Sequence, residues 1–220
     1  MSDKFKEIYR KSIDDPENFW RKAADDIFWF KKPSKILNKS NPPFYKWFED
    51  GVTNTCYNAL DIHIDNGQGQ KTALIYDSPI TGNKSKLTYE ELRSKVSKFA
   101  GALKNQGVGK GDRVIIYMPM IPEAVIAMLA CGRIGAIHSV VFGGFASNEL
   151  ASRIDDSKAK ILVTASCGFE PGRTVEYKPL VDEAVKLASH KISKMILFQR
   201  KGHEAKLNAP TEISWDEALA

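Results

Sequence analysis

The sequence lacks any long apolar segment. Its longest apolar region, residues 124–137, is interrupted by Cys131, Gly132, Arg133 and Gly135, and it falls short of the roughly 20 residues needed to cross a bilayer. The first twenty residues are polar and acidic and lack the apolar core of a secretory signal peptide. We therefore expect an intracellular protein with no partner in the membrane.

Cysteine is scarce. The three cysteines, Cys56, Cys131 and Cys167, are far apart in the sequence and form no Cys-x-x-Cys motif and no cluster with the four histidines. Such spacing supports neither a disulfide framework nor a zinc site. We expect buried, reduced thiols and no metal site.

A concentrated positive charge is also missing. The chain has 32 basic and 27 acidic residues, a net charge of +5, and the excess is scattered along the sequence. Because nucleic-acid binding requires a basic patch or stripe, we expect no nucleic-acid partner. A small anionic ligand remains compatible with this charge.

The common catalytic and nucleotide-binding motifs are absent. The glycines of residues 107–111 precede a predicted strand and lack the Lys-Ser/Thr pair of a phosphate loop. Residues 67–69 lack the third glycine of a dinucleotide fingerprint, and no Gly-x-Ser-x-Gly elbow occurs. These searches assign no catalytic residue.

The first 66 residues differ in composition from the rest. They contain three of the four tryptophans but little β-branched material. Asp15 is placed as an N-cap before Pro16, and apolar residues follow at helical spacing as far as Ile27. We expect a helical or irregular extension over residues 1–66, without a sheet.

Residues 67–220 alternate between apolar runs typical of buried strands and amphipathic helices. Thr88 and Glu91 form a capping box for one helix, Pro122 begins another, Ser147 is expected to cap a third, and residues 180–189 form a fourth. Near-continuous apolar strands separated by helices predict an α/β fold, with a parallel sheet covered by helices on both faces. The five expected strands are residues 72–76, 113–118, 136–142, 160–164 and 194–198.

Two glycine-containing segments follow predicted strands. Residues 140–145 end a strand in two glycines between phenylalanines, and residues 164–173 form a turn-rich loop that carries Arg173. Ligands of open parallel sheets bind beyond the carboxyl ends of strands, and a guanidinium there can hold a phosphate. Ordinary loop closure is the alternative, with Arg173 capping the next helix or pairing with Glu176.

At these residues the sequence resembles the AMP-forming acetyl- and propionyl-CoA synthetases of the adenylate-forming superfamily, and within them the propionate-type branch. The resemblance extends over nearly the whole chain and is carried by residues 15–20, 57–61, 117–145 and 171–173 together with the capping-box helix. It implies a helical extension over residues 1–66 and the incomplete first α/β subdomain of the AMP-binding domain over residues 67–220.

The resemblance implies a ligase that converts acetate or propionate, ATP and coenzyme A (CoA) to acyl-CoA, AMP and pyrophosphate through an acyl-adenylate, with Mg²⁺ as cofactor. It also implies a CoA site at Phe142, Gly143, Gly144, Glu170, Pro171, Gly172 and Arg173. Acetate-preferring members commonly have Arg at the position of Glu170, so this chain departs from a two-arginine clamp.

The family's Ser/Thr/Gly-rich phosphate loop, ribose-binding aspartate and mobile lysine have no counterpart in the 220 residues. We therefore expect an N-terminal portion that is inactive alone and needs the remainder of its polypeptide, in the cytoplasm or the mitochondrial matrix. Two alternatives remain open. One is a stand-alone module that binds the CoA nucleotide or a partner, and the other is a scaffold acting through the aromatic N-terminal layer.

Overall fold

The computed structural model describes residues 3–220, which divide into two compact units, residues 3–54 and 55–220. This division falls earlier in the chain than the boundary expected at residue 66. None of the helices in the described part of the chain is long and apolar enough to cross a membrane.

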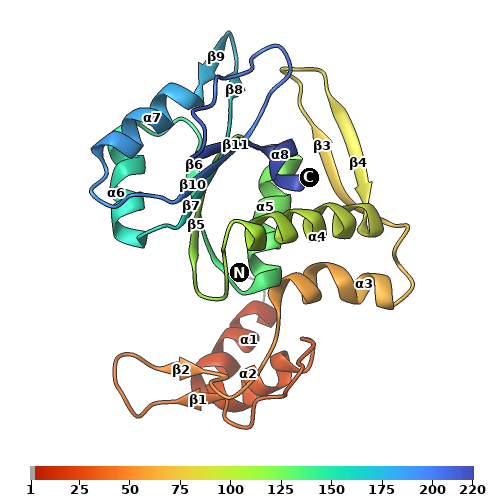
Figure 1. The fold of residues 1–220 in the computed structure, drawn as a ribbon. Coiled ribbons are helices and arrows are strands. Elements are labelled where there is room, and N and C mark those ends of the chain that lie inside the picture. Colours follow the sequence, from red (N-terminus) through yellow and green to blue (C-terminus); the bar gives the residue numbers. More distant parts are fainter. Residues whose placement is uncertain (1–2) are drawn as a thin grey trace. The chain divides into compact units, whose positions relative to one another are not determined.

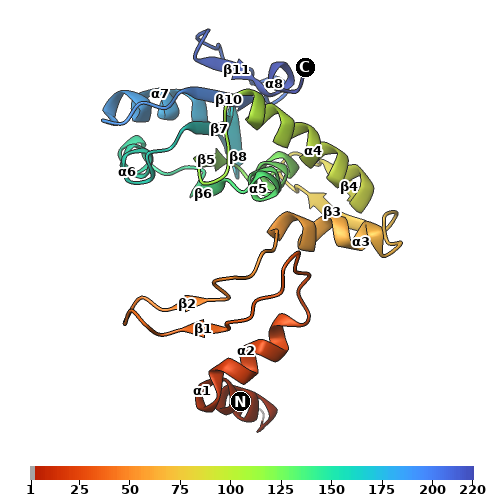
Figure 2. The ribbon, with the colours of Figure 1, turned by 60° about the horizontal axis from the view of Figure 1, so that its bottom comes forward.

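The N-terminal unit consists of two helices and a small hairpin (Figure 2). Helices α1 (Asp3–Asp14) and α2 (Pro16–Ala24) follow one another, and Asp15 Oδ1 accepts a hydrogen bond from the Asn18 backbone N–H at 3.2 Å. The predicted N-cap and proline start of α2 are therefore confirmed. The helix ends at Ala24, before the expected Ile27.

The expectation that this region contains no sheet is wrong. Strands β1 (Leu37–Asn38) and β2 (Lys46–Trp47) pair antiparallel, and the Trp47 ring contacts the Trp20 ring edge-on at 6.1 Å. A two-residue strand is too short to show the alternation of apolar and polar residues by which strands are detected.

The second unit contains a five-stranded, fully parallel sheet with the order β11-β10-β7-β5-β6 (Figure 1). Neighbouring strands are in close register, for example Ile116 opposite Val163 and Val163 opposite Ile196. The strands are β5 (Arg113–Met118), β6 (Ile137–Phe142), β7 (Ile161–Ala165), β10 (Lys194–Phe198) and β11 (Glu212–Ser214).

Helices cover both faces of this sheet, as the sequence predicts (Figure 1). One face carries α4 (Tyr89–Asn105), α5 (Pro122–Ile134) and α8 (Trp215–Leu219), and the other carries α6 (Ser147–Ser157) and α7 (Tyr177–Leu187). The α/β fold class is confirmed.

In the strands of the parallel sheet, the side chains of successive residues pack into the hydrophobic cores on opposite faces of the sheet. Ile116 and Ile161 pack under α4 and α5, whereas Ile115 and Leu162 pack under α6 and α7, and all four are fully buried. Because a central parallel strand is buried on both faces, its residues are apolar without alternation. This is why the sequence shows continuous apolar runs here.

The membership of the sheet differs from the prediction. The strand expected at residues 72–76 is β3 (Thr72–Asp77), which pairs antiparallel with β4 (Lys84–Thr88) in a separate two-stranded sheet. Ile75 in β3 is 66% exposed, so this strand lacks the two covered faces of a central parallel strand. The fifth strand of the main sheet is β11, which the sequence analysis missed.

The helix ends are partly as predicted. The Thr88 capping box is confirmed, with the Glu91 N–H donating to Thr88 Oγ1 and the Thr88 N–H donating to Glu91 Oε2. Ser147 is not a cap: Ala146 is the N-cap of α6, and the Ser147 hydroxyl donates to Glu183 Oε2 on α7 at 3.0 Å.

The chain between β7 and α7 forms a further hairpin. Strands β8 (Cys167–Glu170) and β9 (Arg173–Glu176) pair antiparallel, and α7 begins directly after them at Tyr177, earlier than the expected residue 180. A short π-helix (Tyr57–Asp61) and α3 (Ile62–Asp65) complete the unit. The hairpin matters because it carries one of the two predicted ligand-binding segments.

Candidate functional site

A cavity of about 340 Å³ lies at the carboxyl edge of the parallel sheet. Residues at or beyond the ends of four strands contribute to its wall: Met118 at the end of β5, Phe142 at the end of β6, Gly168 beyond β7 and Arg200 beyond β10. Ligands of open parallel sheets bind at this edge, so this cavity is the candidate site.

The end of β6 is held close to the neighbouring strand. Tyr117, fully buried at the end of β5, donates its hydroxyl to the Phe145 carbonyl at 3.0 Å and accepts the Gly144 N–H at 3.2 Å. Gly144 has a φ of +110°, a conformation that favours glycine. The Phe142 ring is 68% exposed and offers a flat apolar surface beside this turn.

The second predicted segment is the β8–β9 hairpin. Glu170 and Arg173 are cross-strand neighbours, and Pro171 and Gly172 form the two-residue turn between them. Gly172 has a φ of +76°, a value that type II turns require at the second central position and that favours glycine there.

Tyr177 brings these two segments together. A Cβ atom on either Gly143 or Gly168 would clash with the Tyr177 hydroxyl, so the phenol end lies directly against both glycines. In addition, a Cβ on Gly144 would lie 3.7 Å from Glu170 Oε1. The structure therefore places both loops side by side, and that they form one ligand site stays a prediction.

Arg173 is not free. Its Nε donates to Glu170 Oε2 at 2.7 Å, and its terminal nitrogen lies 2.6 Å from the same oxygen. The alternative of a pair with Glu176 is therefore corrected, because the partner is Glu170, directly across the hairpin. The guanidinium is well exposed, and part of its charge is offset by the Glu170 carboxylate.

Two residues of the cavity were missed by the sequence analysis. Arg200 follows β10, and its guanidinium lies 4.7 Å from the centre of the Phe169 ring, while its backbone N–H donates to Ser166 Oγ at 2.8 Å. Tyr177 is almost fully buried. Arg200 could have been predicted as a site residue, because it is the first basic residue after the carboxyl end of the strand predicted at residues 194–198.

The surroundings of Tyr177 in the cavity wall keep its phenol group protonated. Burial, reinforced by the neighbouring Tyr117 and Glu170, raises the pKa of Tyr177 to about 12, whereas the positive charge of Arg200 acts in the opposite direction. Burial also raises the pKa of the Cys167 thiol. At neutral pH the Tyr177 hydroxyl is therefore a hydrogen-bond donor.

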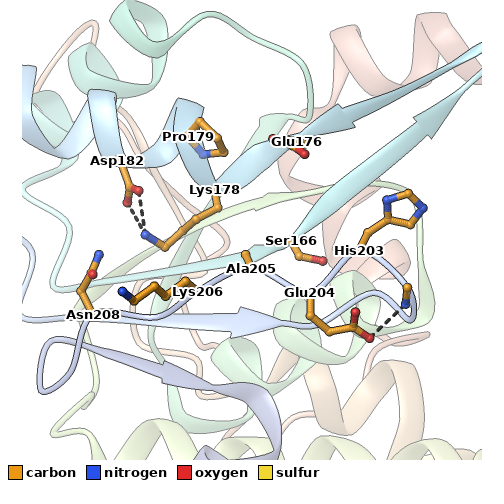
Figure 3. A pocket seen from close by; sticks show the side chains of 11 residues that line it. Ser166, Glu176, Lys178, Pro179, Asp182, His203, Glu204, Ala205, Lys206 and Asn208 are labelled. Atoms are coloured by element: carbon orange, nitrogen blue, oxygen red, sulfur yellow. Dashed lines mark hydrogen bonds and ion pairs between the residues drawn. The ribbon is translucent and has the colours of Figure 1, made fainter.

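A larger cavity of about 620 Å³ lies between α7 and the loop that follows β10 (Figure 3). One of its lysines is paired: Lys178 Nζ lies 2.6 Å from Asp182 Oδ1, also in the lining, and 3.1 Å from Glu212 Oε2 beside the cavity. Its lining includes none of the residues expected to bind CoA. Despite its size, it is a weaker candidate than the sheet-edge cavity.

Among residues 3–220, no group of histidine, cysteine or acidic side chains could hold a metal ion. The three cysteines are free and buried, as the sequence predicts. We therefore assign no Mg²⁺ ligand to this part of the chain.

Comparison with known proteins identifies the family. The family model for AMP-binding enzymes matches residues 63–218, and that for the N-terminus of acetyl-coenzyme A synthetase matches residues 5–59. The chain belongs to the AMP-binding enzymes. The resemblance noted in the sequence is confirmed.

Relatives of this AMP-binding enzyme chain include the mitochondrial acyl-CoA synthetase short-chain family member 3 of Homo sapiens, 54% identical over 98% of this chain and 32% of the relative. Acetyl-coenzyme A synthetase of Streptomyces coelicolor is 45% identical over 97% of this chain. The solved acetoacetyl-CoA synthetase from Streptomyces lividans matches with a TM-score of 0.83 and 25% identity, over 96% of this chain and 32% of its own. The chain thus spans about a third of the length of these relatives.

Proposed function

We propose that this chain provides the CoA-nucleotide site of an AMP-forming short-chain acyl-CoA ligase. In that reaction acetate or propionate and ATP give an acyl-adenylate and pyrophosphate, and the CoA thiol then displaces AMP. The observation that carries the proposal is the convergence of the Gly143–Gly144 turn and the Glu170–Arg173 hairpin at the sheet-edge cavity, in a chain 54% identical to a short-chain acyl-CoA synthetase.

Each part of the proposed site suits one part of the CoA nucleotide. The exposed Phe142 ring provides a stacking surface for adenine, and the backbone of Gly143 and Gly144 permits close approach. Arg173 lies at the tip of the hairpin with the charge to contact the 3′-phosphate, while Pro171 and Gly172 set the turn. Glu170 competes with the phosphate for Arg173, which weakens the contact.

The groups that act on ATP in the proposed reaction are expected outside this 220-residue chain. The 220-residue sequence contains no Ser/Thr/Gly-rich loop ending in lysine, so the groups that neutralise the transferred phosphoryl charge come from the remainder of the polypeptide. The partners are accordingly a short carboxylate, CoA, ATP with Mg²⁺, and that remainder. By analogy with the human relative, the mitochondrial matrix is the proposed location.

A chimera tests the proposed activity. This chain replaces the matching third of the human relative, and formation of acetyl-CoA and propionyl-CoA is measured with the unmodified human enzyme as control. We expect acyl-CoA formation by the chimera and no carboxylate-dependent ATP–pyrophosphate exchange by the 220-residue chain. A folded chimera that forms the adenylate but never the thioester would contradict the assignment of the CoA site to this chain.

Arg173→Ala in the same chimera tests the phosphate contact. A charge-assisted hydrogen bond contributes about 1.5–3 kcal/mol, so the KM for CoA should rise about ten- to hundredfold, while ATP–pyrophosphate exchange stays nearly unchanged. Dephospho-CoA, which lacks the 3′-phosphate, should be insensitive to the substitution. Glu170→Gln should lower the KM for CoA because it releases Arg173. Equal losses for CoA and dephospho-CoA would refute the assignment.

A further inference from the structure

We propose that the Tyr177 hydroxyl and the Arg200 guanidinium together bind a phosphoryl group of the nucleotide that enters the sheet-edge cavity. The proposal rests on the function proposed above and deepens it. It adds two specificity-determining residues that lie on elements other than the glycine turn and the hairpin tip.

Tyr177 is a buried side chain with a polar atom in the cavity wall. It is 4% exposed, its ring packs against the Tyr117 ring with centres 5.0 Å apart, and it lines the cavity. Within residues 3–220 the Tyr177 hydroxyl has no hydrogen-bond partner, in contrast to that of Tyr117, which has two. A largely buried phenol normally finds a partner. The Tyr177 oxygen is not sealed off from the cavity that its side chain lines, so it is placed to donate to a ligand atom there.

The glycines fix where that hydroxyl lies. Gly143, in the turn after β6, and Gly168, in strand β8, both contact it, and neither position leaves room for a Cβ atom. The donor is therefore held in one place at the junction of the two segments. A fixed donor in a cavity loses little freedom when a ligand binds, which favours affinity.

Arg200 supplies a positive charge at the same cavity. Its guanidinium rests on the Phe169 ring, and its backbone is held by Ser166. In the described part of the chain, no carboxylate lies within ion-pair distance of Arg200, whereas Arg173 is paired with Glu170 at 2.6 Å. Arg200 is thus the cation of this cavity with its charge still available.

The combination suits a phosphoryl oxygen. Guanidinium and hydroxyl groups both donate hydrogen bonds, and phosphate accepts several at once. The raised pKa of Tyr177 keeps its proton in place at neutral pH, so the phenol donates to an anion rather than repelling it. CoA offers two such groups, the 3′-phosphate and the diphosphate.

Calorimetric titration of CoA into the 220-residue chain tests the proposal. The variants are Tyr177→Phe, which keeps the ring that packs against the glycines, and Arg200→Gln. Two matched controls are Lys201→Gln, which removes the adjacent charge outside this cavity, and Tyr89→Phe, which removes a phenol hydroxyl elsewhere in the unit. Thermal denaturation verifies that every variant folds.

We expect each cavity variant to weaken CoA binding about tenfold, the size of one charge-assisted contact, and the controls to stay within about twofold. The double variant should lose less than the product of the two single losses, because both groups hold the same phosphoryl group. Arg200→Lys should recover part of the affinity. Dephospho-CoA separates the sources: it is insensitive to the variants if the 3′-phosphate is held, and equally sensitive if the diphosphate is.

The outcomes separate this proposal from the function on which it rests. If the parent chain binds CoA and both folded variants bind it equally well, the Tyr177–Arg200 assignment is wrong and the CoA site stands. If the parent chain binds no CoA while the chimera makes acyl-CoA, the nucleotide does not use this cavity and the assignment falls. If neither binding nor acyl-CoA formation occurs, both proposals are overturned.

Discussion

The two units of the chain use apolar residues differently. Residues 55–220 bury theirs in two cores on either side of a parallel sheet, whereas residues 3–54 hold most of the tryptophan and leave many large apolar side chains exposed. Exposed aromatics of the N-terminal unit include Phe5, Tyr9, Trp20, Phe30, Phe44, Tyr45 and Trp47. Aromatic content alone therefore does not build a core, because burial requires a second layer against which each face can pack.

The largest expected difference concerns one isoleucine from each unit. Ile161→Ala in β7 removes a fully buried side chain and should lower the free energy of unfolding by about 2–5 kcal/mol. Ile13→Ala in α1, where the side chain is 62% exposed, should change it by less than about 0.5 kcal/mol. Urea denaturation measures both. A large loss for Ile13→Ala would show that the apolar face of α1 is covered in solution.

Tightly packed glycines give the next contrast. Gly143→Ala forces a Cβ against the buried Tyr177 and should cost about 1–3 kcal/mol. Gly51→Ala meets the ring of Trp29, which is half-buried and not enclosed as Tyr177 is, so the cost should be smaller, about 1 kcal/mol. Chemical denaturation provides the measurement.

Gly101→Ala is the control for this pair. It lies in α4 with no atom near the added Cβ and should be neutral or stabilising by up to about 1 kcal/mol. If Gly51→Ala proved as costly as Gly143→Ala, the two units would be equally rigid at these contacts.

Helix caps should show a smaller difference. Thr88 and Glu91 exchange two hydrogen bonds at the start of α4, whereas Asp15 makes a single bond to Asn18 at the start of α2. Thr88→Ala should cost about 1 kcal/mol and Asp15→Ala about 0.5 kcal/mol. Amide hydrogen exchange in the first turn of each helix measures the loss of stability. Equal protection of variant and parent would show that the capping residue does not stabilise its helix.

The smallest effects come from two partly exposed carboxylates, one in each unit. Backbone N–H groups of Ser189 and His190 donate to Asp155, and the Ser34 hydroxyl together with the backbone of Ser34 and Lys35 donates to Asp50. These hydrogen bonds, led by the His190 N–H at Asp155 and the Ser34 hydroxyl at Asp50, lower the pKa of both carboxyls.

A carboxyl whose pKa is lower in the folded state stabilises the protein above its unfolded pKa and loses that contribution as the pH falls through its folded pKa. Asp155→Asn and Asp50→Asn should therefore reduce the acid sensitivity of stability, each modestly, as measured by urea denaturation between pH 3 and pH 7. Unaltered acid sensitivity in both variants would show that neither hydrogen-bonded carboxylate contributes.

Much of the second unit was predictable because its signals are local. The buried strands β5, β6, β7 and β10 are continuous apolar runs, and the Thr88 capping box is contained within four residues. Strand β3 has a comparable apolar content and was placed in the wrong sheet. Its partner β4 follows across a short turn. Which sheet a strand joins depends on which of its faces are covered by other elements, and the strand's own sequence does not show this.

The candidate site was predicted in part. Sequence position and family resemblance singled out residues 142–144 and 170–173, and the structure brings them to one edge of the sheet. Tyr177 lies just beyond the second segment, and the sequence analysis assigned it no role. Its role depends on contacts with Gly143 and Gly168, which are 25 residues apart in sequence numbering, and no local pattern reports such a contact.

The sequence by itself determined the alternation of strands and helices, the helix starts at Pro16, Thr88 and Pro122, and the family, because these depend on residues close together in the chain or on motifs read in order. The tertiary structure alone decided that β11 completes the sheet, that Glu170 neutralises Arg173, and that the Tyr177 hydroxyl and Arg200 share one cavity. Those outcomes depend on which distant surfaces meet when the chain buries its apolar faces, and that is set by packing of the whole unit.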